Sequence, residues 1–256
     1  MKTLDLNCDM GEGFGAWKMG DDKALLDYVT SANIACGFHA GDPGTIHRTV
    51  KLALQKGVAV GAHPSLPDLL GFGRRRMNVS ATEAYDMVLF QIGAVAGFAT
   101  ACGGRLAHVK PHGALYNMAV KDRPLADAIA RAVASFDRSL ILFGLPNSDL
   151  VRAGQSAGLR VAVEGFADRA YEPDGSLTPR SRAGAVVHDE AIVVRRALRM
   201  ATEGVVIATD GSELAMRVDT ICTHGDTPGA QSLTRALRTG LEQAGVRVAA
   251  VAGSPR

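Results

Sequence analysis

The chain has 256 residues, a formal net charge of +2, and 47% hydrophobic but only 5% aromatic residues. The only basic cluster is Arg74-Arg75-Arg76, which argues against a nucleic-acid partner, and no apolar run approaches the length that crosses a membrane. Length and aliphatic composition fit one α/β domain over residues 1–256, with parallel strands covered by helices.

Short apolar runs that follow glycine-ended helical segments predict the strands. They cover residues 3–8, 30–37, 57–62, 105–110, 139–144, 159–165 and 218–223, with a further short run at 246–251. Helices are expected to begin at Asp42-Pro43, at the Ser80–Glu83 capping box, at Pro124 and at Pro228. Apolar arms around Asp210-Gly211 predict a β-hairpin insertion over 204–217. The repeated βα units indicate a parallel sheet that either closes into a barrel or is doubly wound.

Four cysteines are present, and none forms a Cys-x-x-Cys pair. The first residues carry no apolar stretch of the kind found in signal peptides, so we expect a cytoplasmic protein with free thiols. Cys8, Cys36 and Cys222 lie near predicted strand ends and are interpreted as small buried side chains rather than nucleophiles.

Four of the seven histidines follow an apolar run and precede a tight turn: His39, His63, His112 and His224. In an α/β barrel the carboxyl ends of the strands converge on one face, where active sites lie. A buried structural imidazole is the alternative for each histidine taken alone. The repetition of the pattern favours a shared site.

Acidic and basic side chains occupy the same kind of position. Asn7, Asp9 and Glu12 surround the end of the first strand, where turn capping is the alternative role. Lys110 ends an apolar strand, and a buried ammonium needs a carboxylate or a substrate oxygen as its partner. Glu164 ends another strand and is expected to face the same way.

Three further charged residues are candidates for contacts with substrate. Asp168 and Arg169 form a salt bridge with each other or hold substrate, and Asp226 follows His224. The mixed set of imidazoles and carboxylates suits a divalent metal such as zinc or manganese. The same groups can also perform acid/base catalysis without a metal.

Six stretches together resemble the LamB/YcsF family: residues 6–12, 33–43, 61–64, 109–117, 164–169 and 222–226. They occur in order over nearly the whole chain. The resemblance implies a parallel (β/α) barrel of seven strands, related to the glycoside hydrolase/deacetylase superfamily. It also implies a subunit of an ATP-dependent 5-oxoprolinase, a hydrolase that acts on a cyclic amide and converts 5-oxo-L-proline to L-glutamate with cleavage of ATP.

The resemblance further implies two partners, 5-oxoprolinase subunits B and C, and ATP as co-substrate. The chain has no Gly-x-x-x-x-Gly-Lys-Ser/Thr phosphate loop, so the nucleotide would bind at an atypical site or on a partner. By analogy with the wider superfamily, a metal, if one is bound, would be held by Asp9 with two of His39, His63 and His112.

We therefore expect two groups of site residues. The catalytic group comprises Asp9, Glu12, His39, His63, Lys110 and His112, and the substrate-binding group comprises Asn7, Glu164, Asp168, Arg169, His224 and Asp226. Two other functions stay open: a stand-alone metal-dependent amidohydrolase or deacetylase, and a non-catalytic scaffold subunit that senses a ligand. Assembly into a homo-oligomer is also open.

Overall fold

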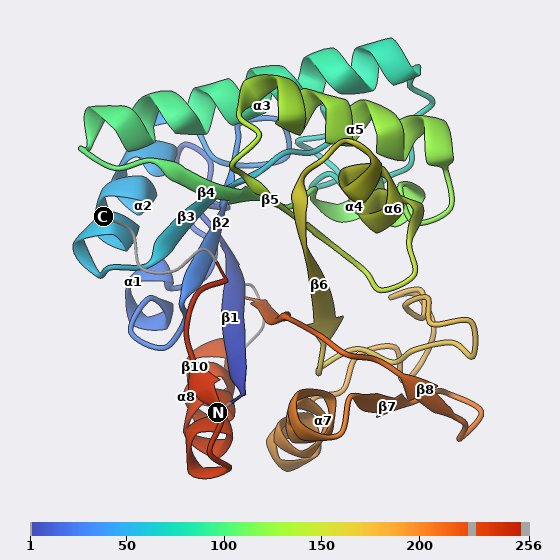
Figure 1. Cartoon of the computed structure of the whole chain (residues 1–256). Coiled ribbons are helices and arrows are strands. Elements are labelled where there is room, and N and C mark those ends of the chain that lie inside the picture. Colours follow the sequence, from blue (N-terminus) through green and yellow to red (C-terminus); the bar gives the residue numbers. More distant parts are fainter. Residues whose placement is uncertain (1, 225–228, 252–256) are drawn as a thin grey trace.

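The structure is a computed structural model that describes residues 2–224 and 229–251, apart from the side chain of His224. A parallel barrel forms its centre (Figure 1). The barrel strands are β1 (Thr3–Met10), β2 (Ser31–Ala35), β3 (Ala59–His63), β4 (Leu106–Val109), β5 (Ile141–Gly144), β6 (Arg160–Phe166) and β9 (Thr220–His224). They pair in that order, and β9 pairs with β1 to close the sheet. The predicted seven-stranded barrel is confirmed, and its strands begin and end within about two residues of the expected ranges.

Helices cover the outside of the barrel. They are α1 (Asp22–Leu25), α2 (Pro43–Gln55), α3 (Ala81–Ala101), α4 (Gly113–Met118), α5 (Arg123–Phe136), α6 (Asp149–Ser156), α7 (Glu190–Thr202) and α8 (Ala230–Gln243). Asp42 caps α2, and Ser80 with Glu83 forms the expected capping box of α3. Helix α5 begins at Arg123, one residue before the expected proline, because Asp122 is its cap. Pro228, the expected start of α8, lies outside the described residues.

Helix α3 is long and apolar enough, by length and composition alone, to cross a membrane, contrary to the expectation from the sequence. In the fold, 33% of this apolar stretch is buried. The helix packs against α5 and against β3 and β4. Its core-facing residues are Ala84, Val88, Gln91, Ile92, Val95 and Ala99.

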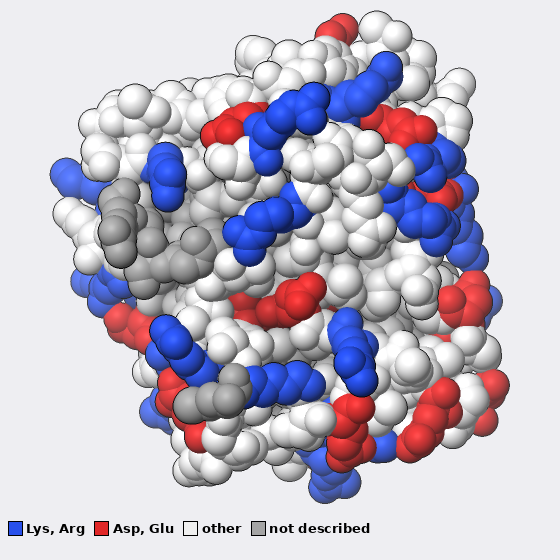
Figure 2. Space-filling view, in the orientation of Figure 1, with Lys and Arg blue, Asp and Glu red and all other residues white. Residues whose placement is uncertain are grey.

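Two smaller pieces complete the fold. The predicted hairpin is present as antiparallel strands β7 (Val205–Ile207) and β8 (Glu213–Ala215), inserted between α7 and β9. Strand β10 (Arg247–Val248) pairs in parallel with the start of β1, at Thr3 and Leu4. On the face shown in Figure 2, Lys and Arg side chains are interspersed with Asp and Glu and with uncharged surface.

The inside of the barrel holds a network of polar side chains beside apolar ones such as Phe143, whose ring stacks on His108. Successive side chains of a strand alternate between its two faces, so Leu4, Leu6 and Cys8 share one face of β1 while Asp5 and Asn7 share the other. The six strand residues Asp5, Asn7, Asn33, His108, Glu164 and Thr220 are all buried.

Hydrogen bonds between strands connect these interior groups. Asn7 donates to Glu164 Oε1 at 3.0 Å and to Thr220 Oγ1 at 2.7 Å, and Asn33 donates to Asn7 Oδ1 at 2.7 Å. Because buried polar groups are stable only when they are paired, this network sets the positions of the side chains above it.

Candidate active site

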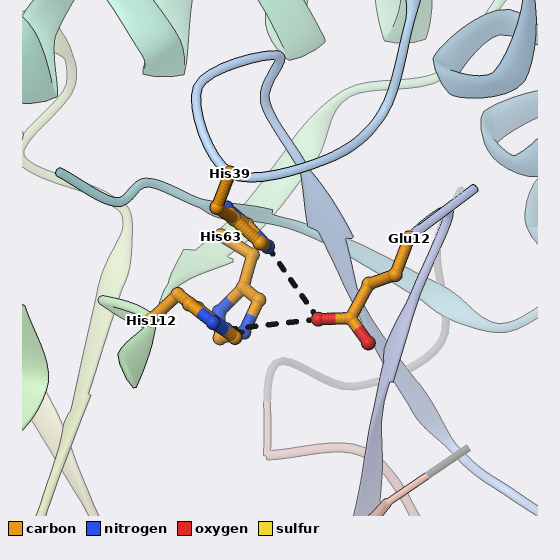
Figure 3. A group of neighbouring side chains, drawn as sticks. All are labelled: Glu12, His39, His63 and His112. Carbon is orange, nitrogen blue, oxygen red and sulfur yellow. Dashed lines mark hydrogen bonds and ion pairs between the residues drawn. The ribbon is translucent and has the colours of Figure 1, made fainter. Parts of the chain in front are cut away.

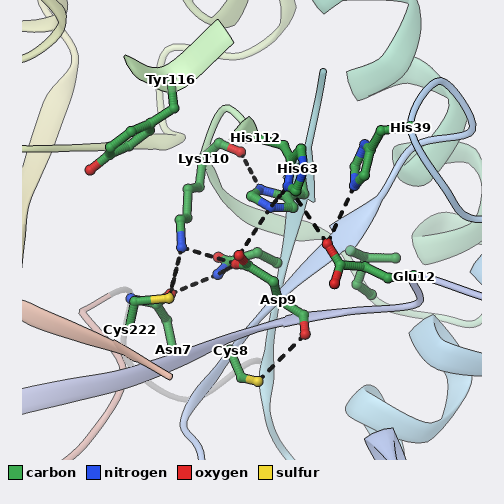
Figure 4. Close-up of polar contacts among 12 residues, drawn as sticks. Asn7, Cys8, Asp9, Glu12, His39, His63, Lys110, His112, Tyr116 and Cys222 are labelled. Carbon is green, nitrogen blue, oxygen red and sulfur yellow. Dashed lines mark hydrogen bonds and ion pairs between the residues drawn. The ribbon is translucent and has the colours of Figure 1, made fainter. Parts of the chain in front are cut away.

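Lys110 is the centre of the polar groups at the carboxyl ends of the strands. It follows β4, and its Nζ lies 2.9 Å from Asp9 Oδ1 and 2.9 Å from Glu164 Oε1. It also donates to Cys222 Sγ at 3.0 Å (Figure 4). Burial favours the neutral amine, but the carboxylates outweigh it, and the pKa of Lys110 lies well above its usual value. Lys110 is therefore a fixed cation rather than a base.

Glu164 and Asn7 lie beneath this lysine. Glu164 accepts from Asn7 and, through Oε2, from the Tyr116 hydroxyl at 2.8 Å. Neither Glu164 nor Asn7 lines the cavity described below. The structure therefore places these two predicted substrate-binding residues where they hold Lys110.

His63 and His112 have their tautomers set by the backbone. Nδ1 of His63 lies 2.6 Å from the carbonyl oxygen of Lys110, and Nε2 of His112 lies 2.8 Å from that of Phe72. A carbonyl oxygen can only accept, so each of these nitrogens carries the proton. The remaining nitrogens, His63 Nε2 and His112 Nδ1, lie 3.0 Å apart, and in neutral rings both present lone pairs.

Two carboxylates face the same point. Asp9 Oδ2 lies 3.3 Å from His63 Nε2. Glu12 Oε1 lies 3.6 Å from His112 Nδ1 and 3.4 Å from His39 Nε2 (Figure 3). Lone pairs and negative charge converge here, so the arrangement requires a positive charge between them, either a proton or a metal ion.

His39 completes the group from the loop after β2. Its ring stacks on that of His112, with centroids 3.8 Å apart and planes 7° from parallel. Within the described residues neither of its ring nitrogens has a hydrogen-bond partner, although the side chain is buried. Burial and the neighbouring imidazoles hold the pKa values of His39 and His112 well below their usual range, so both rings are neutral.

This donor set fits a divalent metal. One atom each from Glu12, His39, His63 and His112 lies within 4.8 Å of every other. Neutral imidazoles with a carboxylate are a zinc-type set, and a carbonyl that accepts the second N–H of the histidine is the usual support for such ligands. The carboxylate of this group is Glu12, whereas the analogy with the wider superfamily implied Asp9. Asp9 borders the group, with Oδ1 held by Lys110 and Oδ2 facing His63 Nε2.

A short loop behind the histidines was missed from the sequence. Phe72 has a φ of 54°, which is strained for a residue other than glycine, and its ring makes edge contacts with His39 and His112. A Cβ on the next residue, Gly73, would lie 2.1 Å from Ser65 Oγ and 2.8 Å from His112 Cδ2. The motif Gly71-Phe72-Gly73 was the available signal.

A cavity of about 530 Å³ opens over these groups. Its floor includes Asp9, His63, Lys110 and His112. Its outer part is lined by residues after β4 and by the segment 176–180. The volume is that of a typical small-molecule site.

The remaining predicted residues are placed as follows. Arg169 is buried and lines the cavity, and it donates to the carbonyl oxygens of Thr178 at 2.7 Å and Ala185 at 3.2 Å. Asp168 is buried beside it without lining the cavity. The backbone of His224 pairs with Asp9, while its side chain and all of Asp226 lie outside the described residues.

The other histidines and the buried thiols lie apart from the cavity. His47 stacks on Phe98, and His188 is exposed. His108 lies inside the barrel against Asn33, and burial lowers its pKa to about 3. The three cysteines near strand ends are buried, as expected, and Cys222 contacts Lys110.

Comparisons with known proteins identify the family of the chain and its relatives. The model of the LamB/YcsF family matches residues 4–255. The A subunit of the 5-oxoprolinase of Methylococcus capsulatus is 58% identical over 252 residues, which covers 98% of this chain and 97% of that protein. A crystal structure of a lactam utilization protein from Thermus thermophilus has a TM-score of 0.92 and 52% identity, covering 98% of this chain and all of that chain.

A more distant likeness concerns the fold alone. A family 4 carbohydrate esterase from Streptomyces lividans, in complex with acetate, has a TM-score of 0.50 and 10% identity. The match covers 99% of this chain and 96% of that one.

Proposed function

Because the chain belongs to the LamB/YcsF family, we propose that it is a subunit of an ATP-dependent 5-oxoprolinase that opens 5-oxo-L-proline to L-glutamate. Support comes from the names of the relatives, which are the A subunit of a 5-oxoprolinase and a lactam utilization protein. The word subunit in the first name supports an assembly, and we propose subunits B and C as the partners.

The observation that carries the proposal is the fixed ammonium of Lys110 at the floor of the cavity, beside Asp9, whose other oxygen faces His63. The lactam is small and anionic, and it presents carboxylate and amide oxygens. Lys110 would bind one of these oxygens through a charge-assisted hydrogen bond that takes the place of its contact with Cys222 Sγ. Its charge is ready before substrate arrives because Asp9 and Glu164 stabilise it.

Asp9 would act on water. One of its oxygens is held by Lys110 and by Asn33, which donates to it at 2.8 Å, so the direction of the other oxygen is set. That oxygen, Oδ2, would orient the attacking water and take its proton.

The lactam amide is stable, which is why coupling to ATP is reasonable. Transfer of the terminal phosphoryl group of ATP to the amide oxygen, with release of ADP, would make the ring carbon electrophilic. Addition of one water and cleavage of the ring C–N bond would then give an acyl phosphate, which a second water would hydrolyse to L-glutamate and phosphate. The nucleotide would bind outside a conventional phosphate loop, on this chain or on a partner.

Glu12, His39, His63 and His112 would hold a divalent cation such as zinc. When bound, such a cation polarises oxygen atoms and lowers the pKa of water. The chain's own contribution is to direct one lone pair of His63 and one of His112 inward, because the carbonyls of Lys110 and Phe72 accept the N–H on the other side of each ring.

The test is reconstitution with components left out one at a time. The purified chain, the two partner subunits, ATP and 5-oxoproline are combined, and L-glutamate is measured. We expect glutamate only when all components are present. If the isolated chain cleaves the lactam or another amide without ATP, it is a stand-alone amidohydrolase. If glutamate forms at the full rate without this chain, its role is not catalytic.

A further inference from the structure

The outer part of the cavity is strongly cationic. Apart from Lys110 on the floor, the basic residues that line it are Arg74, Arg76, Lys121, Arg169 and Arg180. Among the described lining residues, Asp9 is the sole carboxylate, and Lys110 already pairs with it. Lys121 is likewise paired, with Asp174 at 2.8 Å. Arg169 and Arg180 therefore add positive charge at the entrance that no carboxylate among the described lining residues balances.

The surroundings of Arg169 disfavour its positive charge. Its guanidinium is buried and donates to two neutral carbonyl oxygens. Burial, together with the nearby charges of Arg180 and Arg74, lowers its pKa to about 10, although Asp168 opposes the shift. Like charges gathered in a partly dry site are expected where an anionic ligand binds between them.

Two arginines of one loop, Arg180 and Arg182, differ in whether they line the cavity. It lines the cavity from the segment 176–180 and has no ion-pair partner in the described part of the chain. Arg182, two residues further on, does not line the cavity and pairs with Glu172 at 3.2 Å. The loop thus directs Arg180 toward the cavity, whereas Arg182 forms an ion pair at the surface.

We propose that Arg169 and Arg180, with Arg74, form a subsite for a phosphoryl group at the entrance of this cavity. A carboxylate carries one negative charge, and Lys110 on the floor is already suited to it. A phosphoryl group carries nearly two charges and three acceptor oxygens, which suits several guanidinium forks. A cavity of about 530 Å³ has room for a small ring on the floor and a phosphoryl group outside it.

The subsite deepens the proposed function and rests on it in one respect: ATP-coupled ring opening supplies two phosphoryl ligands. One is a phosphorylated lactam, and the other is the polyphosphate chain of the nucleotide. Both present the same chemistry to the arginines. Binding measurements on the full chain separate the two sources without any turnover.

The experiment is calorimetric titration of the full chain with inorganic phosphate at low salt. The wild-type chain is expected to bind saturably, Arg180→Gln about tenfold more weakly, and the matched control Arg182→Gln as the wild type does. Arg169→Lys, which keeps the charge but loses the planar fork, is a second variant with a weaker affinity expected. Circular dichroism checks that each variant is folded.

Competition identifies the source. If ATP displaces phosphate, the subsite serves the polyphosphate chain; if phosphate binds together with 5-oxoproline and ATP does not compete, it serves the phosphorylated lactam. Either outcome supports the subsite. No saturable phosphate binding by the wild type, or equal binding by the two glutamine variants, overturns it. Phosphate binding with no glutamate formation in the reconstituted complex rejects the proposed function alone.

Discussion

Nε2 of His63 lies 3.0 Å from Nδ1 of His112, and each of these rings donates its other N–H to a backbone carbonyl. Two lone pairs at this distance repel each other unless a proton or a metal ion lies between them. The carboxylate of Glu12 and Nε2 of His39, which lie 3.4 Å apart, face the same point, which favours the metal.

The purified chain is therefore expected to bind zinc or manganese. Replacing His39 with alanine should weaken the affinity at least about tenfold, because it removes one ligand atom. His47→Ala is the matched control, since His47 stacks on Phe98 away from the group. Metal content by mass spectrometry and the metal-induced rise in Tm give the readout. A chain that neither carries nor gains a metal would leave a shared proton as the bridging charge.

Phe72 is expected to act on metal binding through the two imidazoles it touches. Phe72→Gly relieves the strained backbone but removes the ring contacts with His39 and His112, so Tm should change little while metal affinity falls about tenfold. Phe90→Ala, at an exposed phenylalanine on α3, is the control and should leave the affinity unchanged. Unchanged affinity in Phe72→Gly would limit this residue to a packing role.

Gly73→Ala tests how tightly the loop is packed against the histidines. A new Cβ would overlap Ser65 Oγ and approach His112 at a φ of 63°, so we expect a loss of about 2–4 kcal/mol in the free energy of unfolding. Gly57 has a similar φ of 69°, but no atom lies within 4 Å of the position that its Cβ would take. Gly57→Ala should therefore cost only about 1–2 kcal/mol in chemical denaturation. Equal losses would show that backbone strain alone matters.

Removing the charge of Lys110 should destabilise the barrel. Lys110→Met leaves the buried carboxylates of Asp9 and Glu164 without their cation, and the expected loss is about 3–5 kcal/mol. Adding Glu164→Gln removes one of the stranded charges and should restore part of the loss. A double-mutant cycle by urea denaturation measures this coupling, and additive losses would contradict it.

Asp5, deeper in the barrel, predicts a pH dependence of stability. Burial raises its pKa to about 6, although hydroxyls of Thr220, Thr30 and Ser31 donate to it and oppose the shift; the charge of Glu164 raises it further. Between about pH 4 and pH 6 the folded carboxyl keeps a proton that the unfolded chain has lost. The wild type should therefore lose about 3 kcal/mol of stability as pH rises through this window.

Asp5→Asn is the comparison, because it cannot titrate. The stability of the wild type relative to this variant should fall between pH 4 and pH 6 and then stay constant. A relative stability that rises over the same window would mean that the carboxyl is charged in the folded state.

The alternation of strands and helices predicted a parallel sheet but left a closed barrel and a doubly wound sheet open, and the barrel followed from the resemblance to the LamB/YcsF family. The burial of Lys110 against carboxylates could also be predicted, because an ammonium at the end of an apolar strand has few other stable environments. Neither prediction needed a distance between remote segments.

The sequence could not predict which of the two carboxylates, Asp9 or Glu12, contacts Lys110 and which joins the convergent histidines. Asp9 lies near the end of β1 and Glu12 follows that strand, and only the path of the chain after β1 takes Glu12 to His39 and His112, while Asp9 lies between Lys110 and His63. Phe72 was missed for a related reason. Its backbone carbonyl oxygen and its ring edge both contact His112, which is 40 positions away in the chain. A pattern of side chains in the sequence does not show where a backbone carbonyl points.

The most direct measurement is the rate of L-glutamate formation by the reconstituted complex carrying His112→Ala, compared with His47→Ala. His112 lines the cavity and belongs to the convergent group, whereas His47 lies outside both. We predict a fall in kcat of about a hundredfold or more for His112→Ala and a change of less than about twofold for His47→Ala. Equal rates for the two variants, with both folded and assembled, would contradict the assignment of this cavity as the place where the ring is opened.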